Sequence, residues 1–285
     1  MISVTQGMVT LGLCLSFAAL VLAQAQAPGP AAPPAGRSPS AGEGPAAGPA
    51  GSARQPDAGA SANITVRWYG QAFFSLTRID GLTVVIDPFA EMGYPVPKDL
   101  RADVVLVTHG HSDHANTDVL EGSPTVLKAE DAVGSHTVKG TTFVGTATFH
   151  DEEGGAKRGR NTVFSFELAG VRFCHMGDIG HLLTDAQRQS IGPVDVLMVP
   201  VGGYYTIPVE KVDSLIGQLN PKVVIPMHYK TEAVPGLPIA PVSTWLQGKK
   251  AVKRLGSSSV TVQAAELPKS QEIWVLEAPA GLHAQ

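Results

Sequence analysis

Four side chains that can bind a metal ion lie within one short segment, His109-Gly110-His111-Ser112-Asp113-His114. The apolar run Val104–Val107 before it is typical of a buried strand, so the segment falls on the loop past that strand's end. Imidazoles and a carboxylate without a thiolate suit zinc, with iron and manganese as competing metals. The alternative, a solvated histidine-rich turn, gives no reason for this combination of ligand types after a buried strand. The segment therefore predicts a metal site.

Three further ligand candidates are found later in the chain. Asp178, in His175-Met176-Gly177-Asp178, and His228, in Pro226-Met227-His228-Tyr229, each follow a β-rich apolar run. His150 comes after the run Thr142–Phe149, but the residues around it are weakly patterned. An ordinary loop role is the alternative for Asp178 and His150, and a hydrogen-bonded core histidine is the alternative for His228.

Short β-rich runs begin abruptly at Ile64 and predict a layered α/β domain, a fold class in which sites assemble where strands end. The predicted strands are Ile64–Tyr69, Ala72–Leu76, Thr83–Ile86, Val104–Thr108, Thr142–Phe149, Val163–Leu168, Val171–His175, Val194–Val199 and Val223–Met227. The predicted helices are Asn116–Leu120, Thr184–Ser190, Val209–Leu219 and Val242–Val252. A capping box at Thr184-Asp185-Ala186-Gln187 indicates where the second of these helices begins.

The first 62 residues differ in composition from the rest of the chain. An apolar run from Met8 to Leu22, followed by Ala-x-Ala sites, predicts a signal peptide over residues 1–27 and an exported protein, periplasmic or secreted. Neither Lys nor Arg precedes this run, so an uncleaved anchor is the alternative, although the run is short for a membrane span. Residues 28–62 are mostly Ala, Gly, Pro and Ser and predict a disordered linker.

Composition narrows the remaining classes of protein and partner. The net charge of -4, with 16% charged residues, indicates a globular domain and gives no sign of nucleic-acid binding. One domain is expected over residues 63–285, acting on a small-molecule or lipid substrate and meeting a membrane only through an uncleaved leader. Cys14 and Cys174 are the two cysteines, and removal of the leader would leave no intramolecular disulfide.

Several motifs together are similar to those of one known family. Besides the HxHxDH segment, the chain has Ile86-Asp87-Pro88, Val199-Pro200-Val201-Gly202-Gly203 and Tyr205-Thr206. From residue 63 onward the chain resembles the metallo-β-lactamase superfamily. More narrowly, it resembles the Zn-dependent hydrolases that include ascorbate-6-phosphate lactonase and, more distantly, N-acyl-phosphatidylethanolamine phospholipase D. The resemblance implies an α/β fold of four layers, an αββα sandwich.

The resemblance also implies a binuclear site with two Zn²⁺ ions per chain, or Mn²⁺ or Fe²⁺ in their place. The implied ligands are His109, His111 and His150 for one metal, Asp113, His114 and His228 for the second, and Asp178 as the bridge. Catalytic roles are expected for Asp113, Asp178 and His181.

The residues around these ligands have less certain roles. Asp87 is expected to accept the distal N–H of a ligand histidine, with an ordinary turn residue as the alternative. His181 either lines the pocket as a proton donor or packs at a helix end, and Tyr205 has the same ambiguity. His175 is either a buried structural histidine or a partner of a ligand.

Five other arginine, cysteine and histidine residues are not expected among the metal ligands. Arg158 and Arg160 lie in a glycine-rich loop and would meet either an anionic substrate or only water. Cys174 lies inside a predicted strand, where a buried, inert thiol is expected rather than a metal ligand. His136 and His283 are expected at the surface.

These features predict a metal-dependent hydrolase in which a metal-bridging hydroxide attacks an ester, lactone, amide or phosphodiester bond. Two adjacent divalent cations lower the pKa of a shared water from about 15.7 toward roughly 7, so no nucleophilic side chain is required. The chain also lacks the Gly-x-Ser-x-Gly elbow of serine hydrolases. Two alternatives stay open: a di-iron redox protein on the same fold, and a metal-stabilised binding protein without turnover. Fold membership alone does not identify the substrate.

Overall fold

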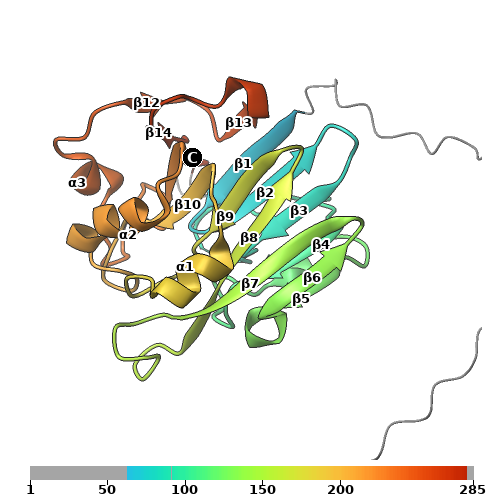
Figure 1. Ribbon diagram of the computed structural model, residues 1–285, viewed down its shortest axis with the longest axis horizontal. Helices are drawn as coiled ribbons and strands as arrows, with labels where there is room; N and C mark the ends of the chain where they lie inside the picture. Colours follow the sequence, from blue (N-terminus) through green and yellow to red (C-terminus); the bar gives the residue numbers. More distant parts are fainter. Residues whose placement is uncertain (1–62, 91, 281–285) are drawn as a thin grey trace, which may run out of the picture. The chain divides into compact units, whose positions relative to one another are not determined.

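Two β-sheets dominate the computed structural model, which describes residues 63–90 and 92–280 (Figure 1). One sheet has six strands in the order β13-β1-β2-β3-β4-β5, and the other has eight in the order β12-β14-β11-β10-β9-β8-β7-β6. The predicted signal peptide and linker lie outside the described residues. The α/β fold class expected from the sequence is confirmed.

The six-stranded sheet comprises β1 (Ile64–Gly70), β2 (Phe73–Arg78), β3 (Thr83–Ile86), β4 (Val104–Val107), β5 (Thr125–Lys128) and β13 (Ser259–Val262). The eight-stranded sheet comprises β6 (Gly134–Val138), β7 (Thr141–Phe149), β8 (Arg160–Leu168), β9 (Val171–His175), β10 (Val196–Pro200), β11 (Val223–Met227), β12 (Val252–Arg254) and β14 (Glu272–Val275). The α-helices are α1 (Asp185–Ile191), α2 (Val212–Leu219) and α3 (Val242–Leu246). Short 3₁₀ turns are η1 (Thr117–Val119), η2 (Ala129–Ala132), η3 (Val209–Lys211) and η4 (Ala264–Glu266).

The main hydrophobic core contains residues from both sheets, and strand β4 shows how this arrangement shapes the sequence. Val104 and Leu106 belong to the core shared with the eight-stranded sheet, whereas Val105 and Val107 belong to a second cluster. Successive strand residues point to opposite faces, so a strand covered on both faces reads as an unbroken apolar run. This is why the residues before the HxHxDH segment lack a polar side.

The outer layers of the molecule are built differently from each other. Helices α1, α2 and α3 lie on the side of the eight-stranded sheet and contribute to the main core (Figure 1). The second cluster, formed around Phe73, Phe89, Tyr94 and Val234, contains no residue of a described α-helix. Loops therefore form the layer on that side. None of the helices between residues 63 and 280 is long and apolar enough to span a membrane.

Several predicted elements need correction. Asn116–Leu120 holds only the 3₁₀ turn η1, and the helix expected over Val242–Val252 ends at Leu246. Strands β5, β6, β12, β13 and β14 were not predicted. Short strands with many partly or fully exposed residues, such as Thr125–Lys128 and Gly134–Val138, show little apolar periodicity.

The capping box at Thr184 is confirmed. Its side chain accepts a hydrogen bond from the Gln187 backbone N–H, and the Gln187 side chain accepts one from the Thr184 backbone N–H. These two bonds satisfy N–H groups that have no partner inside the helix.

The directions of the strands place the C-terminal ends of several strands at one edge of each sheet. Strand β3 runs parallel to β4, and β9 runs parallel to β10, which in turn runs parallel to β11. Strand β7 is antiparallel to β8, which is antiparallel to β9, so β7 points the same way as β9. Backbone bonds from Thr162 N to Thr108 O (2.9 Å) and from His228 N to Gln71 O (3.0 Å) tie the two edges together.

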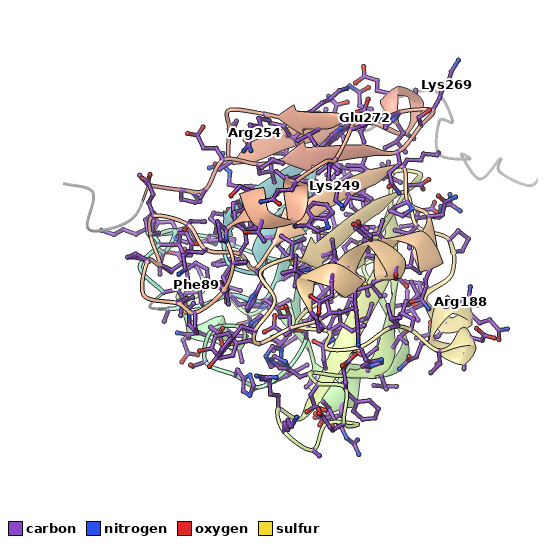
Figure 2. All side chains as sticks on the ribbon, turned by 90° about the vertical axis from the view of Figure 1, so that its left-hand side faces the viewer. Phe89, Arg188, Lys249, Arg254, Lys269 and Glu272 are labelled. Carbon is purple, nitrogen blue, oxygen red and sulfur yellow. The ribbon has the colours of Figure 1, made fainter. Side chains whose placement is uncertain are left out.

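We predict that Phe89→Ala destabilises the protein by about 3–5 kcal/mol, because a fully buried aromatic ring is deleted. Phe89, labelled in Figure 2, packs edge-on against Phe73, with ring centroids 5.2 Å apart. The control Ile79→Ala, at a side chain that is 71% exposed, should change stability by no more than about 0.5 kcal/mol. Urea unfolding of both variants checks this. Equal effects would show that the loop layer is not a packed core.

Candidate metal centre

The ligand candidates follow four strand ends that meet at the edge described above. The HxHxDH segment follows β4, His150 follows β7, Asp178 comes three residues after β9, and His228 follows β11. The structure brings all of them together in three overlapping groups, and within each group the possible ligand atoms lie within 4.8 Å of one another. The groups are His109, His111 and His150; His109, His114 and Asp178; and Asp113, His114 and His228.

Asp178 lies between the groups. Its Oδ2 atom is 3.2 Å from the Nε2 atoms of both His150 and His228, and 3.4 Å from Nε2 of His114. Asp113 lies at the side of the site, with its Oδ2 atom also 3.4 Å from His114 Nε2. A single carboxylate therefore contacts histidines from both sets of ligand candidates, which is the geometry that a bridging ligand needs.

Buried polar atoms without hydrogen-bond partners show that the residues fit a metal. Three such atoms are Nε2 of His109, Nε2 of His114 and Oδ1 of Asp178. A buried polar group without a partner is costly, so native structures leave few of them unexplained. A cation between these atoms would satisfy all three, and imidazole with carboxylate is a donor set that zinc accepts.

The electrostatics of the cluster are those of a cation site. Burial and then the neighbouring His114 lower the pKa of His109 to about 2, so this ring is a neutral donor. Burial opposes ionisation of Asp178, but His114 and His228 outweigh it and hold the Asp178 pKa well below its usual range. Burial also opposes the charged form of His114 and so lowers its pKa. The carboxylates of Asp178 and Asp87 outweigh burial and raise the His114 pKa well above its ordinary value. The carboxylates of Asp178 and Asp87 thus favour positive charge in this part of the cluster.

Asp87 lies where the sequence analysis expects it, behind the ligands. Its Oδ2 atom accepts a hydrogen bond from His114 Nδ1 (2.9 Å) and another from Thr108 Oγ1 (2.8 Å), while Oδ1 accepts from Thr108 N (2.8 Å). Thr108 Oγ1 in turn lies 3.0 Å from Nδ1 of His109. These contacts use the Nδ1 atoms of both rings and leave Nε2 of His109 and His114 facing the site.

Asn161 is a supporting residue that the sequence analysis missed. Its Oδ1 atom accepts a hydrogen bond from Asp178 N (3.0 Å), and its Nδ2 group donates to Met176 O (2.9 Å). Between them, Gly177 has φ +55°, and a Cβ there would lie 2.3 Å from Asn161 Oδ1. Asn is disfavoured in strands, so its presence in β8 was the available signal.

Gln71 is the second residue that was missed. It is buried, with φ 49°, and its Nε2 group donates a hydrogen bond to Asp113 Oδ2 (3.3 Å). Its Oε1 atom is buried without a hydrogen-bond partner. A large polar residue after Gly70, between two predicted strands, was the signal in the sequence.

A cavity of about 440 Å³ opens onto the cluster. Ligand candidates from the loops after β4, β7, β9 and β11 form one part of its wall. The remaining wall includes the apolar Met92 and Leu237, the cations Lys157 and Arg158, and Tyr205. The site is therefore accessible to a small organic molecule.

His181 does not line this cavity, and its contacts favour the packing role over the expected proton-donor role. Its Nε2 atom accepts a hydrogen bond from Phe149 N (3.0 Å), and its Nδ1 atom lies 2.7 Å from Leu182 O, to which it donates. Both ring nitrogens are therefore committed to the backbone. The ring links the residue before His150 to the loop that follows Asp178.

The other candidate residues lie outside the cluster. His175 is fully buried and bonds to Ala72 O through Nε2 (3.0 Å), so it is a structural histidine whose Nδ1 is 3.9 Å from Asp87 Oδ2. Cys174 is buried, and burial raises the pKa of its thiol, as an inert core residue requires. Arg160 is exposed at the start of β8. His136 is half-buried rather than fully exposed, and His283 lies outside the described residues.

Comparison with known proteins agrees with this geometry. Residues 65–228 match the model of the beta-lactamase superfamily domain. A UPF0173 metal-dependent hydrolase of Anaeromyxobacter sp. (strain K) is 30% identical over 242 residues, covering 70% of this chain and 87% of its own length. One from Thermococcus onnurineus is 28% identical over 195 residues, covering 59% and 85%.

A solved structure from Thermotoga maritima is also similar. It is assigned to the metallo-beta-lactamase superfamily as a Zn-dependent hydrolase. The TM-score is 0.61 at 38% identity, and the match covers 75% of this chain and 99% of that protein.

We predict that Asp87→Asn weakens metal binding by about 10–100-fold, because it replaces an oxygen that fixes the His114 ring by a donor group. Competition with a chromophoric chelator measures the affinity. Asp80→Asn, at an exposed ion pair with Arg78, is the matched control and should bind metal as the wild type does. An unchanged affinity in Asp87→Asn would remove Asp87 from the support of the site.

For His181→Ala we expect wild-type metal content and a loss of turnover of no more than about tenfold, whereas removing a general acid typically costs about 10²–10⁴-fold. The thermal midpoint should fall, because the Phe149 N–H loses its acceptor. Elemental analysis, kinetics and thermal unfolding measure the three quantities. A loss of 10²-fold or more with intact metal would restore the proton-donor role.

Proposed function

Because the chain belongs to the metallo-β-lactamase superfamily, we propose that it is a metal-dependent hydrolase with a binuclear site. The proposed metals are two Zn²⁺ ions, with Mn²⁺ or Fe²⁺ as substitutes. The proposed reaction is hydrolysis of an ester, lactone, amide or phosphodiester bond. The observation that supports this most directly is the convergence of five histidines and two aspartates in one cluster. Three of these histidines and both aspartates line an accessible cavity.

The proposed ligand sets are the ones implied by the sequence motifs. His109, His111 and His150 would hold one metal, and Asp113, His114 and His228 would hold the other. The contacts of Asp178 with His150 on one side and His228 on the other support its role as the bridge. When bound, such a pair of divalent cations supplies Lewis acidity and a water of lowered pKa.

The residues of the chain itself would prepare and position the reaction. Asp87 and Thr108 hold two imidazoles in the tautomer that presents Nε2 to the site. Gln71 holds Asp113 through a hydrogen bond, and that carboxylate remains partly exposed in the cavity. Tyr205 brings a hydroxyl group to the same wall and takes the place of His181 as the proposed proton donor.

The cellular location of the protein and its class of substrate are also proposals. Export through a signal peptide would favour a lipid, a lactone or a scavenged organophosphate over a cytosolic sugar phosphate. The apolar side chains of Met92 and Leu237 in the cavity wall suit the organic part of such molecules.

We predict that the wild type holds close to two metals per chain and that Asp178→Ala loses at least one of them, together with nearly all hydrolysis. The shared negative charge that allows two cations to lie close together is removed by this change. Elemental analysis and a panel of chromogenic esters, lactones and phosphodiesters measure both properties. Asp185→Ala, whose side chain is 84% exposed on α1, is the control and should behave as the wild type.

Three other outcomes would contradict parts of this proposal. A wild type with at most one tightly held metal would break the binuclear assignment. Iron with redox turnover and no hydrolysis would favour the di-iron alternative. Two metals without any turnover across the panel would favour a binding protein.

A further inference from the structure

The loop between β7 and β8, residues 150–159, is organised by one buried carboxylate. Asp151 is only 4% exposed, and its Oδ1 atom accepts hydrogen bonds from the backbone N–H groups of Glu153 (2.9 Å) and Gly155 (2.8 Å). Its Oδ2 atom accepts from the N–H groups of Lys157 (2.9 Å) and Arg158 (2.7 Å). The backbone that carries the Arg158 side chain is therefore held directly beside the proposed ligand His150.

Apart from Asp151, which is bonded to backbone N–H groups, the charged side chains of this loop form ion pairs, with Arg158 as the exception. Glu152 forms an ion pair with Lys211, and Glu153 forms one with Lys157. Arg158 has no carboxylate partner among the residues that the structure describes. A cation without a counter-ion thus faces the cavity that holds the ligand candidates.

The side chain of Arg158 lies over an aromatic ring rather than against a carboxylate. Its guanidinium carbon lies 5.9 Å from the centroid of the Tyr205 ring, and its side chain is half-buried. A cation over an aromatic face gains about 0.5–1 kcal/mol at exposed sites and more when desolvated, while the N–H groups remain free to bind an anion. Arginine presents these donors in a planar fork that matches a carboxylate or a phosphate.

We propose that Arg158 binds an anionic group of the substrate, a carboxylate or phosphate separate from the bond that is cleaved. This inference rests on the proposed hydrolase function and narrows its substrate class. Two divalent cations would more than offset the charges of Asp113 and Asp178, so the loaded site also attracts an anion. The Tyr205 ring packs against the guanidinium, and Asp151 positions the Arg158 backbone.

A pair of esters that differ in one group tests the proposal. In 4-nitrophenyl valerate the acyl chain ends in a methyl group, and in mono-4-nitrophenyl glutarate a carboxylate stands in its place. The wild-type holoenzyme should favour the glutarate ester in kcat/KM. In Arg158→Gln that preference should fall by about 10–100-fold, the usual effect of losing a charge-assisted hydrogen bond. Arg158→Lys should recover part of it.

The matched control is Arg160→Gln, because Arg160 has the same charge, lies two residues away and does not line the cavity. Its preference for the glutarate ester should equal that of the wild type. An equal loss in both variants would show a general effect of surface charge and would overturn the proposal. So would a preference that survives in Arg158→Gln.

Calorimetric binding of glutarate and butyrate to the same holoproteins tests the inference without turnover. Both anions have one carboxylate for the metal site, and only glutarate has a second for Arg158. The ratio of their Kd values should favour glutarate in the wild type and in Arg160→Gln, and should fall toward one in Arg158→Gln. An unchanged ratio in Arg158→Gln overturns the inference. If neither ester is hydrolysed, esterase activity fails, and this ratio still decides the role of Arg158.

Discussion

The site depends on one fully buried carboxylate, that of Asp87. A buried carboxylate must be hydrogen-bonded, because its desolvation is otherwise far too costly. Asp87 follows β3, and the groups that satisfy it belong to Thr108 and His114, just past the neighbouring parallel strand β4. Its bonds therefore join two strand ends and orient His114, while Thr108 passes the same constraint to His109. The same bonds that join the two strand ends thus also orient two ligand candidates of the site.

Three residues around the same site have a strained backbone. Gln71, Asp87 and His228 all have a left-handed backbone, with φ of 49°, 49° and 50°, which a non-glycine residue adopts at a cost of about 1–3 kcal/mol. The surrounding bonds fix two of these residues against each other, since His228 N donates to Gln71 O. Packing of the two sheets holds these conformations. The side chains of Gln71 and His228 line the cavity, and that of Asp87 lies behind the ligand candidates.

The sequence predicted structure best where metal-binding residues directly follow a buried strand. Strand β4 is covered on both faces, so its apolar run predicted both the strand and the loop that carries the HxHxDH segment. Edge strands such as β6 are largely exposed and left no such pattern. The pairing of His181 with Phe149 N, and that of Gln71 with Asp113, join residues far apart in the chain. Spacing along one sequence carries no information about such contacts, so it could not decide between the two roles expected for His181, and Gln71 was missed.

The loop after β7 joins the metal site to the proposed substrate site. His150 and Asp151 are neighbours in the chain, one turned toward the ligand cluster and the other toward the loop that carries Arg158. Gly180 packs against this backbone so closely that a Cβ would lie 2.3 Å from Asp151 N, and Gly180 N also donates to Phe149 O. The loop after Asp178 therefore packs directly against the His150–Asp151 peptide and helps to hold it in place. The side chains of Glu153 and Lys157 pair with each other outside this contact, so they take no part in holding the His150–Asp151 backbone.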